Sequence, residues 1–274
     1  ASLRRVWHSN GERMLDPGWY AALADGTAEG LGAGQSLTSR DLKHLKAHYD
    51  SGVLAADTYV GLLAEQLKRA NLWENTLVIL VSDHGEDLQD HGFTNHRAVL
   101  FDSTTHVPMI WTGGVIPESL RGLRVDSLVD ALDLVPTVMA AVGTVAPAKS
   151  RGRDLWTPVM AGQSLKEHAV LQQGVLGQTS LRTATHRLTF SGLALTDPDY
   201  LNTLRSAPMT GKHFGLYAAG VDPMEKRNIV ARSPELARRL RSLMVDHVAD
   251  LTPSKSDQQI SPQALQELQS HGYW

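Results

Sequence analysis

The sequence predicts an α/β fold, with a mainly parallel sheet flanked by helices and a small C-terminal antiparallel sheet packed with a helix. Two observations lead to this prediction. Residues 76–81 form an unbroken apolar run rich in β-branched side chains, which is typical of a parallel strand buried on both faces. Several shorter runs after residue 168 have the length and the turn spacing of antiparallel strands.

A long helix is the first element that we expect. Thr38 and Asp41 have the spacing of a capping box, and apolar side chains recur at helical spacing between Leu42 and Leu67. We expect this helix to end at Asn71, because asparagine is common just beyond helix C-termini. We therefore expect the helix directly before the strand at residues 76–81.

A second strand and a second helix follow. Residues 107–112 are predicted to be a strand, because an apolar run ends there at two glycines. Residues 126–142 have a helical pattern that ends at Gly143, although Pro136 must kink or break it. Alternation of strands and helices with long connections is the layout of an α/β protein.

Proline, glycine and small residues between 145 and 162 predict a boundary between two parts, 1–150 and 151–274. Beyond it, four antiparallel strands are expected at 168–172, 181–185, 186–190 and, more weakly, 213–217. A helix should begin at Ser233, with Pro234 at its first position, and a polar linker at 252–261 should precede a last short helix at 262–269. The core face of the helix from Ser233 is expected to consist of Leu236, Leu240, Leu243, Met244 and Val248.

Composition excludes several classes of function. A net charge of -3 without charge runs gives no sign of nucleic-acid binding. No stretch approaches the roughly 18 apolar residues that a membrane helix needs. The chain has no cysteine, which excludes disulfides, thiolate metal ligands and a cysteine nucleophile. A start without methionine or an apolar signal region fits a processed or truncated chain.

Charged side chains and histidines are concentrated in residues 82–97, directly after the first predicted strand. Ligands of open α/β sheets bind beyond the carboxyl ends of the strands, so this is where a site is expected. Asp83 offers a hard oxygen ligand and His84 a nitrogen ligand, and at a chain turn both can reach one ion. Alternatively, the pair simply caps the next helix from a solvated loop. The length of the pattern, which continues through His106, favours a site.

Residues 76–110 resemble the signature block of the sulfatase and alkaline phosphatase superfamily, in which Ser-Asp-His-Gly-Glu follows a strand and a His-Val-Pro strand comes later. Further segments resemble the family in the same order, and the similarity covers nearly the whole chain after residue 38. These segments are the helix at 126–143, the Gly-Arg-Asp-Leu turn at 152–155, Asp-Pro-Met-Glu at 222–225 and the closing stretch at 265–273. The resemblance implies an alkaline-phosphatase-like fold, with 1–150 as the C-terminal part of its α/β core and 151–274 as a small α+β subdomain.

The resemblance also implies roles for four residues. Asp83 and His84 match the second pair of metal ligands, where the family usually holds calcium and sometimes manganese, magnesium or zinc. His96 and Arg97 lie twelve and eleven residues before Pro108, where the family often has catalytic histidine or lysine. Either side chain would neutralise charge that develops on the substrate or the leaving oxygen. For Arg97 the alternative is an exposed loop cation.

Three further histidines are given lesser roles. His91 is expected to support the site from behind or to be structural. His106 is expected to pack at the entry of the second strand. His186 matches an often basic position of the C-terminal sheet that can approach the site.

The chain also departs from the family pattern. The early pair of aspartate ligands and the Cys/Ser-x-Pro-x-Arg nucleophile segment are not found in the sequence. We therefore expect a metal-dependent sulfate ester hydrolase whose N-terminal half lies outside this chain, with a small molecule or glycan as substrate. That half, or a second copy, is expected to cover the exposed edge of the sheet. This chain alone is expected to be inactive. The alternatives are phosphodiester or phosphonate hydrolysis, phosphoglycerol transfer, or a non-catalytic fragment that serves binding or assembly.

Overall fold

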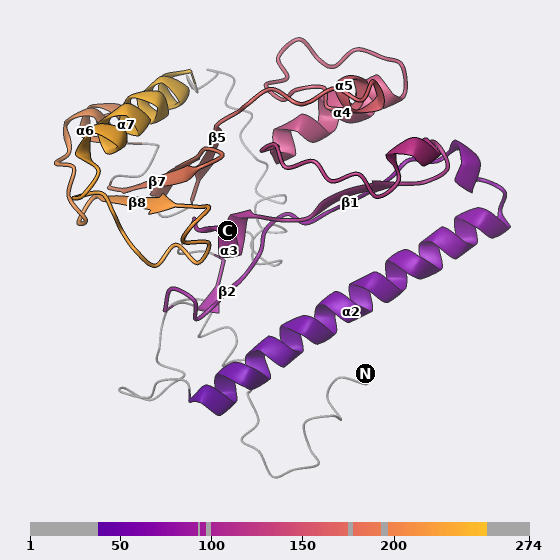
Figure 1. The fold of residues 1–274 in the computed structure, drawn as a ribbon, viewed down its shortest axis with the longest axis horizontal. Coiled ribbons are helices and arrows are strands. Elements are labelled where there is room, and N and C mark those ends of the chain that lie inside the picture. The colour runs from indigo at the N-terminus through magenta and orange to yellow at the C-terminus, as the bar shows by residue number, and fades with distance from the viewer. Residues whose placement is uncertain (1–37, 93, 97–99, 175–177, 193–196, 251–274) are drawn as a thin grey trace, which may run out of the picture.

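A computed structural model describes residues 38–92, 94–96, 100–174, 178–192 and 197–250 (Figure 1). The predicted linker at 252–261 and the predicted helix at 262–269 lie outside these residues. In the described residues no helix has both the length and the apolar character needed to cross a membrane.

The predicted long helix is α2 (Ser39–Arg69). Its capping box is confirmed, since Asp41 N donates to the Thr38 hydroxyl at 3.2 Å and Thr38 N donates to the Asp41 carboxylate at 2.9 Å. The helix ends before Asn71, which has a φ of 58°. Only Leu45 of this helix is buried, and the helix runs diagonally below β1 in Figure 1.

The strands β1 (Val78–Val81) and β4 (Met109–Thr112) occur where they were predicted, but with each other they do not form the predicted parallel sheet. They pair with each other in antiparallel fashion, with Val78 opposite Thr112 and Val81 opposite Met109. All strand pairs among the described residues are antiparallel. A parallel sheet is therefore not confirmed, because an apolar run indicates coverage on both faces and carries no information about strand direction. The coverage is also incomplete, since Val81 and Ile110 are exposed.

The helix predicted at 126–142 is shorter than expected. It consists of η5 (Ala131–Asp133) and α4 (Leu134–Ala141), because the Asp130 carboxylate accepts from Leu132 N at 2.7 Å and starts the first turn there. Pro136 lies in the first turn of α4, where its missing N–H has no intrahelical partner to lose. Gly143 ends the helix at a φ of 73°, as predicted. The described residues also contain five shorter helices: η3 (Trp73–Asn75), α3 (Asp102–Thr105), η4 (Glu118–Leu120), α5 (Trp156–Met160) and α6 (Tyr200–Ser206).

The C-terminal antiparallel sheet is confirmed, with four strands in the order β5-β6-β7-β8. Their bounds are β5 (Val170–Gln173), β6 (Gln178–Arg182), β7 (His186–Ser191) and β8 (Phe214–Ala218). The strand expected at 181–185 instead ends at Arg182. Thr183 turns the chain there, because its N–H and its hydroxyl both donate to His186 O and its hydroxyl accepts from His186 N.

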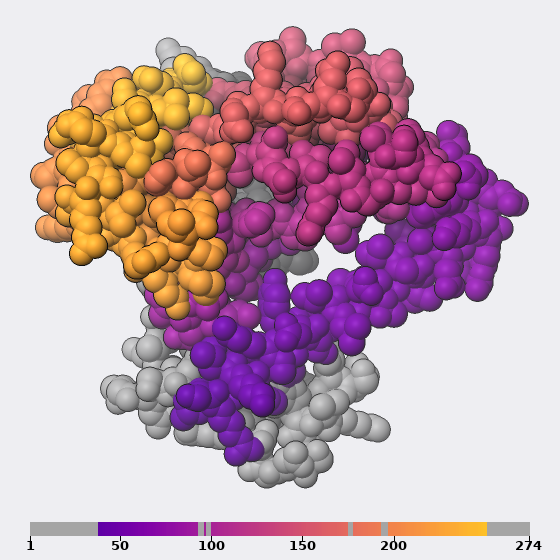
Figure 2. All heavy atoms as spheres, in the orientation of Figure 1, coloured from indigo at the N-terminus to yellow at the C-terminus, as the bar shows by residue number. Residues whose placement is uncertain are grey.

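The helix α7 (Pro234–Ala249) packs on this sheet, and the core lies between them. Leu240 and Met244 are buried, and the other three predicted core residues of the helix pack partly buried against the same cluster. The predicted core face is therefore confirmed. In the space-filling view this sheet and α7 form one lobe, with α2 along the opposite side (Figure 2).

Shortening a core leucine of α7 should destabilise the chain much more than shortening an exposed one. Leu240→Ala removes methyl groups from the buried cluster and is expected to lower the free energy of unfolding by about 2–5 kcal/mol. Leu54→Ala, on the exposed part of α2, should change it by no more than about 0.5 kcal/mol. Urea unfolding of both variants measures the difference. Equal effects would mean that α7 is not packed on the sheet.

Candidate metal and catalytic site

A small hairpin follows β1 and positions the charged residues of the motif. Its strands, β2 (Asp87–Leu88) and β3 (Thr94–Asn95), pair in antiparallel register with Asp87 opposite Asn95. Antiparallel register then places Glu86, one residue before β2, beside His96, one residue after β3. The hairpin therefore joins two parts of the motif that are ten residues apart in sequence.

Gly85 holds the start of this segment against α3. Its N–H donates to Thr104 O at 2.8 Å. A Cβ atom at this position would lie 2.3 Å from Ser103 O, which is a backbone atom that cannot easily move away. Glycine is therefore required here by the close approach of two backbone segments. This contact fixes the backbone between His84 and Glu86.

Three side chains meet at this point: His84, Glu86 and His96. One potential ligand atom of each lies within 4.8 Å of the others. The Glu86 carboxylate is 2.9 Å from Nδ1 of His96 and 3.9 Å from Nδ1 of His84. The two imidazole rings stack with their centres 3.7 Å apart. All three side chains are about 30% exposed, so water and small ligands can reach them.

Asp83 lies on the other side of the His84 ring. Its Oδ1 is 3.7 Å from Nε2 of His84 and accepts a hydrogen bond from His84 N at 2.9 Å. Nδ1 of His84 faces Gly85 O at 3.0 Å. The ring therefore presents one nitrogen toward Asp83 and the other toward Glu86 and Gly85. The two predicted metal ligands are adjacent, and their role in metal binding stays a prediction.

The described donors do not by themselves fit calcium. Calcium takes six to eight oxygen ligands, whereas this region offers two carboxylates on different sides of one imidazole. Sequence reasoning did not single out Glu86, although it belongs to the Ser-Asp-His-Gly-Glu segment. Only the hairpin register shows that Glu86 reaches His96. Arg97, the other predicted catalytic residue, lies outside the described residues.

The remaining predicted histidines lie apart from the cluster. Among the described residues, the group of possible metal ligands includes neither His106, which is exposed, nor His186. His186 contacts the Thr185 hydroxyl at 2.9 Å instead. Burial, together with the positive charges of Arg239 and Arg182, lowers the pKa of His186.

Asp87 and His91 support the hairpin from behind. The Asp87 carboxylate is fully buried and accepts hydrogen bonds from His91 N at 3.1 Å and from the Ser103 hydroxyl at 3.1 Å. Nδ1 of His91 lies 2.5 Å from the same carboxylate, and its Nε2 contacts Met224 O at 2.9 Å. The His91 ring also stacks on Phe101. His91 therefore connects the hairpin to the turn after β8, as expected of a structural residue.

Arg187 of β7 joins α3 to the C-terminal sheet. Its side chain is fully buried, and it donates to Glu225 at 2.6 Å and to the Asp102 carboxylate. It also donates to Leu100 O at 2.8 Å. The second carboxylate oxygen of Glu225 accepts from Asp102 N at 2.6 Å. The sheet β5–β8 therefore fixes the position of α3, whose Thr104 carbonyl accepts the hydrogen bond from Gly85.

The pKa values of the two carboxylates beside Arg187 are shifted in opposite directions. Burial alone would raise the pKa of Asp102, but the guanidinium groups of Arg187 and Arg182 outweigh it and hold the pKa below its usual range. Burial raises the pKa of Glu225, and Arg187 offsets this only in part. Asp102 has two arginine partners, whereas Glu225 has one and is more deeply buried.

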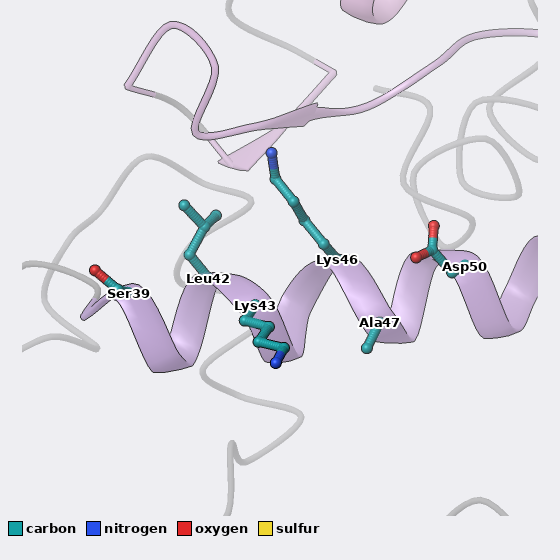
Figure 3. A pocket seen from close by; sticks show the side chains of 6 residues that line it. All are labelled: Ser39, Leu42, Lys43, Lys46, Ala47 and Asp50. Carbon is teal, nitrogen blue, oxygen red and sulfur yellow. The ribbon is translucent and has the colours of Figure 1, made fainter.

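α2 contacts the hairpin at its first turns. Nζ of Lys46 lies 3.5 Å from Oδ1 of Asp90. In Figure 3 the Lys46 side chain extends from the helix toward the ribbon above it. A hollow of about 440 Å³ opens along the same helix (Figure 3). It is lined by Ser39, Leu42, Lys43, Lys46, Ala47 and Asp50. None of these residues belongs to the His84 cluster, so we do not assign the hollow to the site.

Comparisons with known proteins agree with the motif. The sulfatase family model matches residues 16–144, which include the whole cluster. Arylsulfatase K of Rattus norvegicus is 29% identical over 133 residues, which are 48% of this chain and 23% of that protein. The chain therefore spans about a quarter of the length of this relative.

Two solved structures share the fold. A 2-O GAG sulfatase superposes with a TM-score of 0.63 at 20% identity, over 78% of this chain and 44% of that one. A phosphonate monoester hydrolase from Silicibacter pomeroyi superposes with a TM-score of 0.65 at 20% identity, over 88% of this chain and 48% of that one. The helices and sheets are therefore arranged as in sulfatases and phosphonate hydrolases.

Removing the Arg187 guanidinium should destabilise the chain strongly. Arg187→Met leaves two carboxylates without their buried partner, so we expect the free energy of unfolding to fall by about 3–5 kcal/mol. The matched control is Arg238→Met, which breaks an exposed pair with Glu235 and should cost less than about 1 kcal/mol. Urea unfolding gives both values. Adding Glu225→Gln to Arg187→Met should recover part of the loss, and a further loss would contradict the charge-pairing account.

Proposed function

The chain belongs to the sulfatase family, and from this premise we propose that the protein containing it hydrolyses sulfate esters of a small molecule or glycan. The match of the family model to residues 16–144 is the observation on which this proposal rests. The same residues include the loop after β1, where His84, Glu86 and His96 meet in a water-accessible position. A sulfuric ester hydrolase needs a water-accessible position of this kind, where the anionic sulfate group of its substrate can bind.

His96 is the proposed proton-transfer residue. Glu86 is 2.9 Å from its Nδ1, so the carboxylate can fix the ring orientation. A histidine held in this way can give a proton to the leaving oxygen of an ester. We propose Arg97 as a second cation near the transferred group, next to His96 in sequence.

Calcium is the proposed metal of the sulfatase reaction, with manganese, magnesium or zinc as alternatives. Asp83 and Nε2 of His84 would supply one side of its coordination. Calcium needs further oxygen ligands, which we propose come from polypeptide outside the described residues. Metal bound there would neutralise charge on the sulfate oxygens.

A partner polypeptide is part of the proposal for two reasons. The sequence contains no cysteine and no Ser-x-Pro-x-Arg segment, so we propose that the nucleophile is supplied from outside this chain. Large apolar side chains of α2 and of the β1-β4 pair are also exposed, which favours further coverage by polypeptide. These exposed side chains include Leu54, Tyr59, Leu62, Leu63 and Ile110. The covering element would be another part of the enzyme, which would supply parallel strands beside β1, or a second copy of this chain.

Hydrolysis of a phosphonate or phosphate ester is the second candidate. It is favoured by the superposition with the phosphonate monoester hydrolase, which covers more of this chain than that with the 2-O GAG sulfatase. Both reactions neutralise anionic oxygens and protonate a leaving oxygen, so the described residues serve either. A fragment without catalysis, retained for binding or assembly, is the candidate of a different class.

The assay compares an aryl sulfate with an aryl phosphonate monoester, using the enzyme that contains this chain. We expect turnover of the sulfate, and His96→Ala should lower kcat by about 10²–10⁴-fold because proton transfer to the leaving group is lost. His106→Ala is the matched control, since His106 is exposed and outside the cluster, and it should leave kcat close to wild type.

The isolated chain should not turn over either ester until the complementing polypeptide is added, because the nucleophile is missing. Turnover of the phosphonate alone would favour the second candidate. Turnover by the isolated chain that survives Asp83→Ala would refute the proposed mechanism. No turnover in the complemented enzyme would favour the non-catalytic candidate.

A further inference from the structure

The Asp-Pro-Met-Glu turn at 222–225, after β8, has no part in the proposed hydrolysis, yet it contacts both segments that hold the candidate site. We infer that this turn positions the site and that Glu225 is its positioning residue. The effect on turnover rests on the proposed function. The contacts of the turn belong to this chain alone, so they can be tested without turnover.

The sequence of this segment favours a tight turn. Asp222 and Pro223 occupy its first two positions, where aspartate and proline are preferred. Glu225 N donates to Asp222 O at 2.8 Å and closes the turn. The Asp222 carboxylate also accepts from Arg227 N at 2.8 Å, which fixes the chain that leaves the turn. The turn therefore has a defined shape before any contact with the site is considered.

Glu225 has a left-handed backbone conformation, with a φ of 48°. Glycine adopts this conformation readily, whereas a residue with a Cβ atom does so at a cost. Such strained positions persist only where surrounding contacts hold them, and they are frequent at functional sites. The Glu225 side chain supplies these contacts, because it is almost fully buried and both of its carboxylate oxygens accept hydrogen bonds.

The first contact of the turn is with α3. One oxygen of Glu225 accepts from Asp102 N, at the first residue of that helix, and the other accepts from Nε of Arg187, each at 2.6 Å. Arg187 in turn pairs with the Asp102 carboxylate. Thr104 of the same helix accepts the hydrogen bond of Gly85 N at 2.8 Å. Glu225 therefore fixes the helix that holds the loop between two residues of the cluster.

The second contact of the turn is with the β2-β3 hairpin. Met224 O lies 2.9 Å from Nε2 of His91, and the same ring lies 2.5 Å from the buried Asp87 carboxylate. Asp87 directly follows Glu86 and is paired with the residue before His96. Two consecutive residues of the turn therefore reach both segments whose relative position brings the cluster together.

Two substitutions of Glu225 separate positioning from stability. Glu225→Ala and Glu225→Gly both remove the carboxylate, but glycine also relieves the left-handed strain. Glu225→Gly should therefore unfold at a higher urea concentration than Glu225→Ala. In the enzyme that contains this chain, both should lower kcat to a similar extent, about 10–100-fold, because the cluster is no longer held in place. KM should change less than kcat, since the buried Glu225 side chain cannot contact a substrate.

Asn71→Ala is the matched control. Asn71 also has a left-handed backbone, with a φ of 58°, but it is exposed and lies just beyond α2. Alanine should lower stability there through the same strain and leave kcat close to wild type. Glu225→Gln is a milder variant in case the others do not fold. Its amide has one accepting oxygen in place of two, so it should lose less kcat than Glu225→Ala.

Amide hydrogen exchange measures the same coupling without turnover. The Gly85 N–H should exchange at least about tenfold faster in the Glu225 variants than in wild type, and at the wild-type rate in Asn71→Ala. Unchanged exchange at Gly85 in the Glu225 variants would overturn the inference. A loss of kcat that follows stability, and is therefore also present in Asn71→Ala, would overturn it as well. Absence of turnover in the wild-type enzyme would count against the proposed function alone, and the exchange rates would still decide the role of the turn.

Discussion

The candidate site depends on the ion pairs that the buried Arg187 guanidinium forms. It brings together carboxylates from two distant parts of the chain, Asp102 of α3 and Glu225 after β8. A buried charge needs such partners, because an unpaired one would carry a large desolvation cost. Through Asp102 the pairing positions α3, and through the contact of Thr104 with Gly85 it positions the loop after β1. The C-terminal lobe therefore supports the segment that carries the candidate site.

Most of the helices and strands could be predicted from local patterns in the sequence. The capping box of Thr38 and Asp41 and the apolar face of α7 are local patterns that the structure confirms. The predicted parallel pairing of β1 is not confirmed, because the same apolar run fits a parallel or an antiparallel neighbour. The turn at Thr183 was missed because threonine is common in strands, so residues 183–185 fit the end of a strand as well as a turn.

The motif after β1 predicted where the candidate site lies, but it did not identify all the residues that meet there. Asp83, His84 and His96 were chosen from their spacing and from the family resemblance. Glu86 was not, because its proximity to His96 follows from the register of a hairpin whose strands have two residues each. Strands this short have no periodicity that a sequence can reveal. Arg187 was likewise invisible, since a buried arginine looks like any other arginine until its carboxylate partners are known.

His84 and His96 carry the proposed hydrolysis, and Glu86 meets both of them at the β2-β3 hairpin. The measurement that decides this arrangement is a crystal structure of the enzyme that contains this chain, grown with calcium. We predict a metal ion beside Asp83 and His84, with Glu86 and His96 side by side on the hairpin. A hairpin in another register, with Glu86 and His96 apart, or a metal ion bound away from Asp83 and His84, would contradict the proposed site.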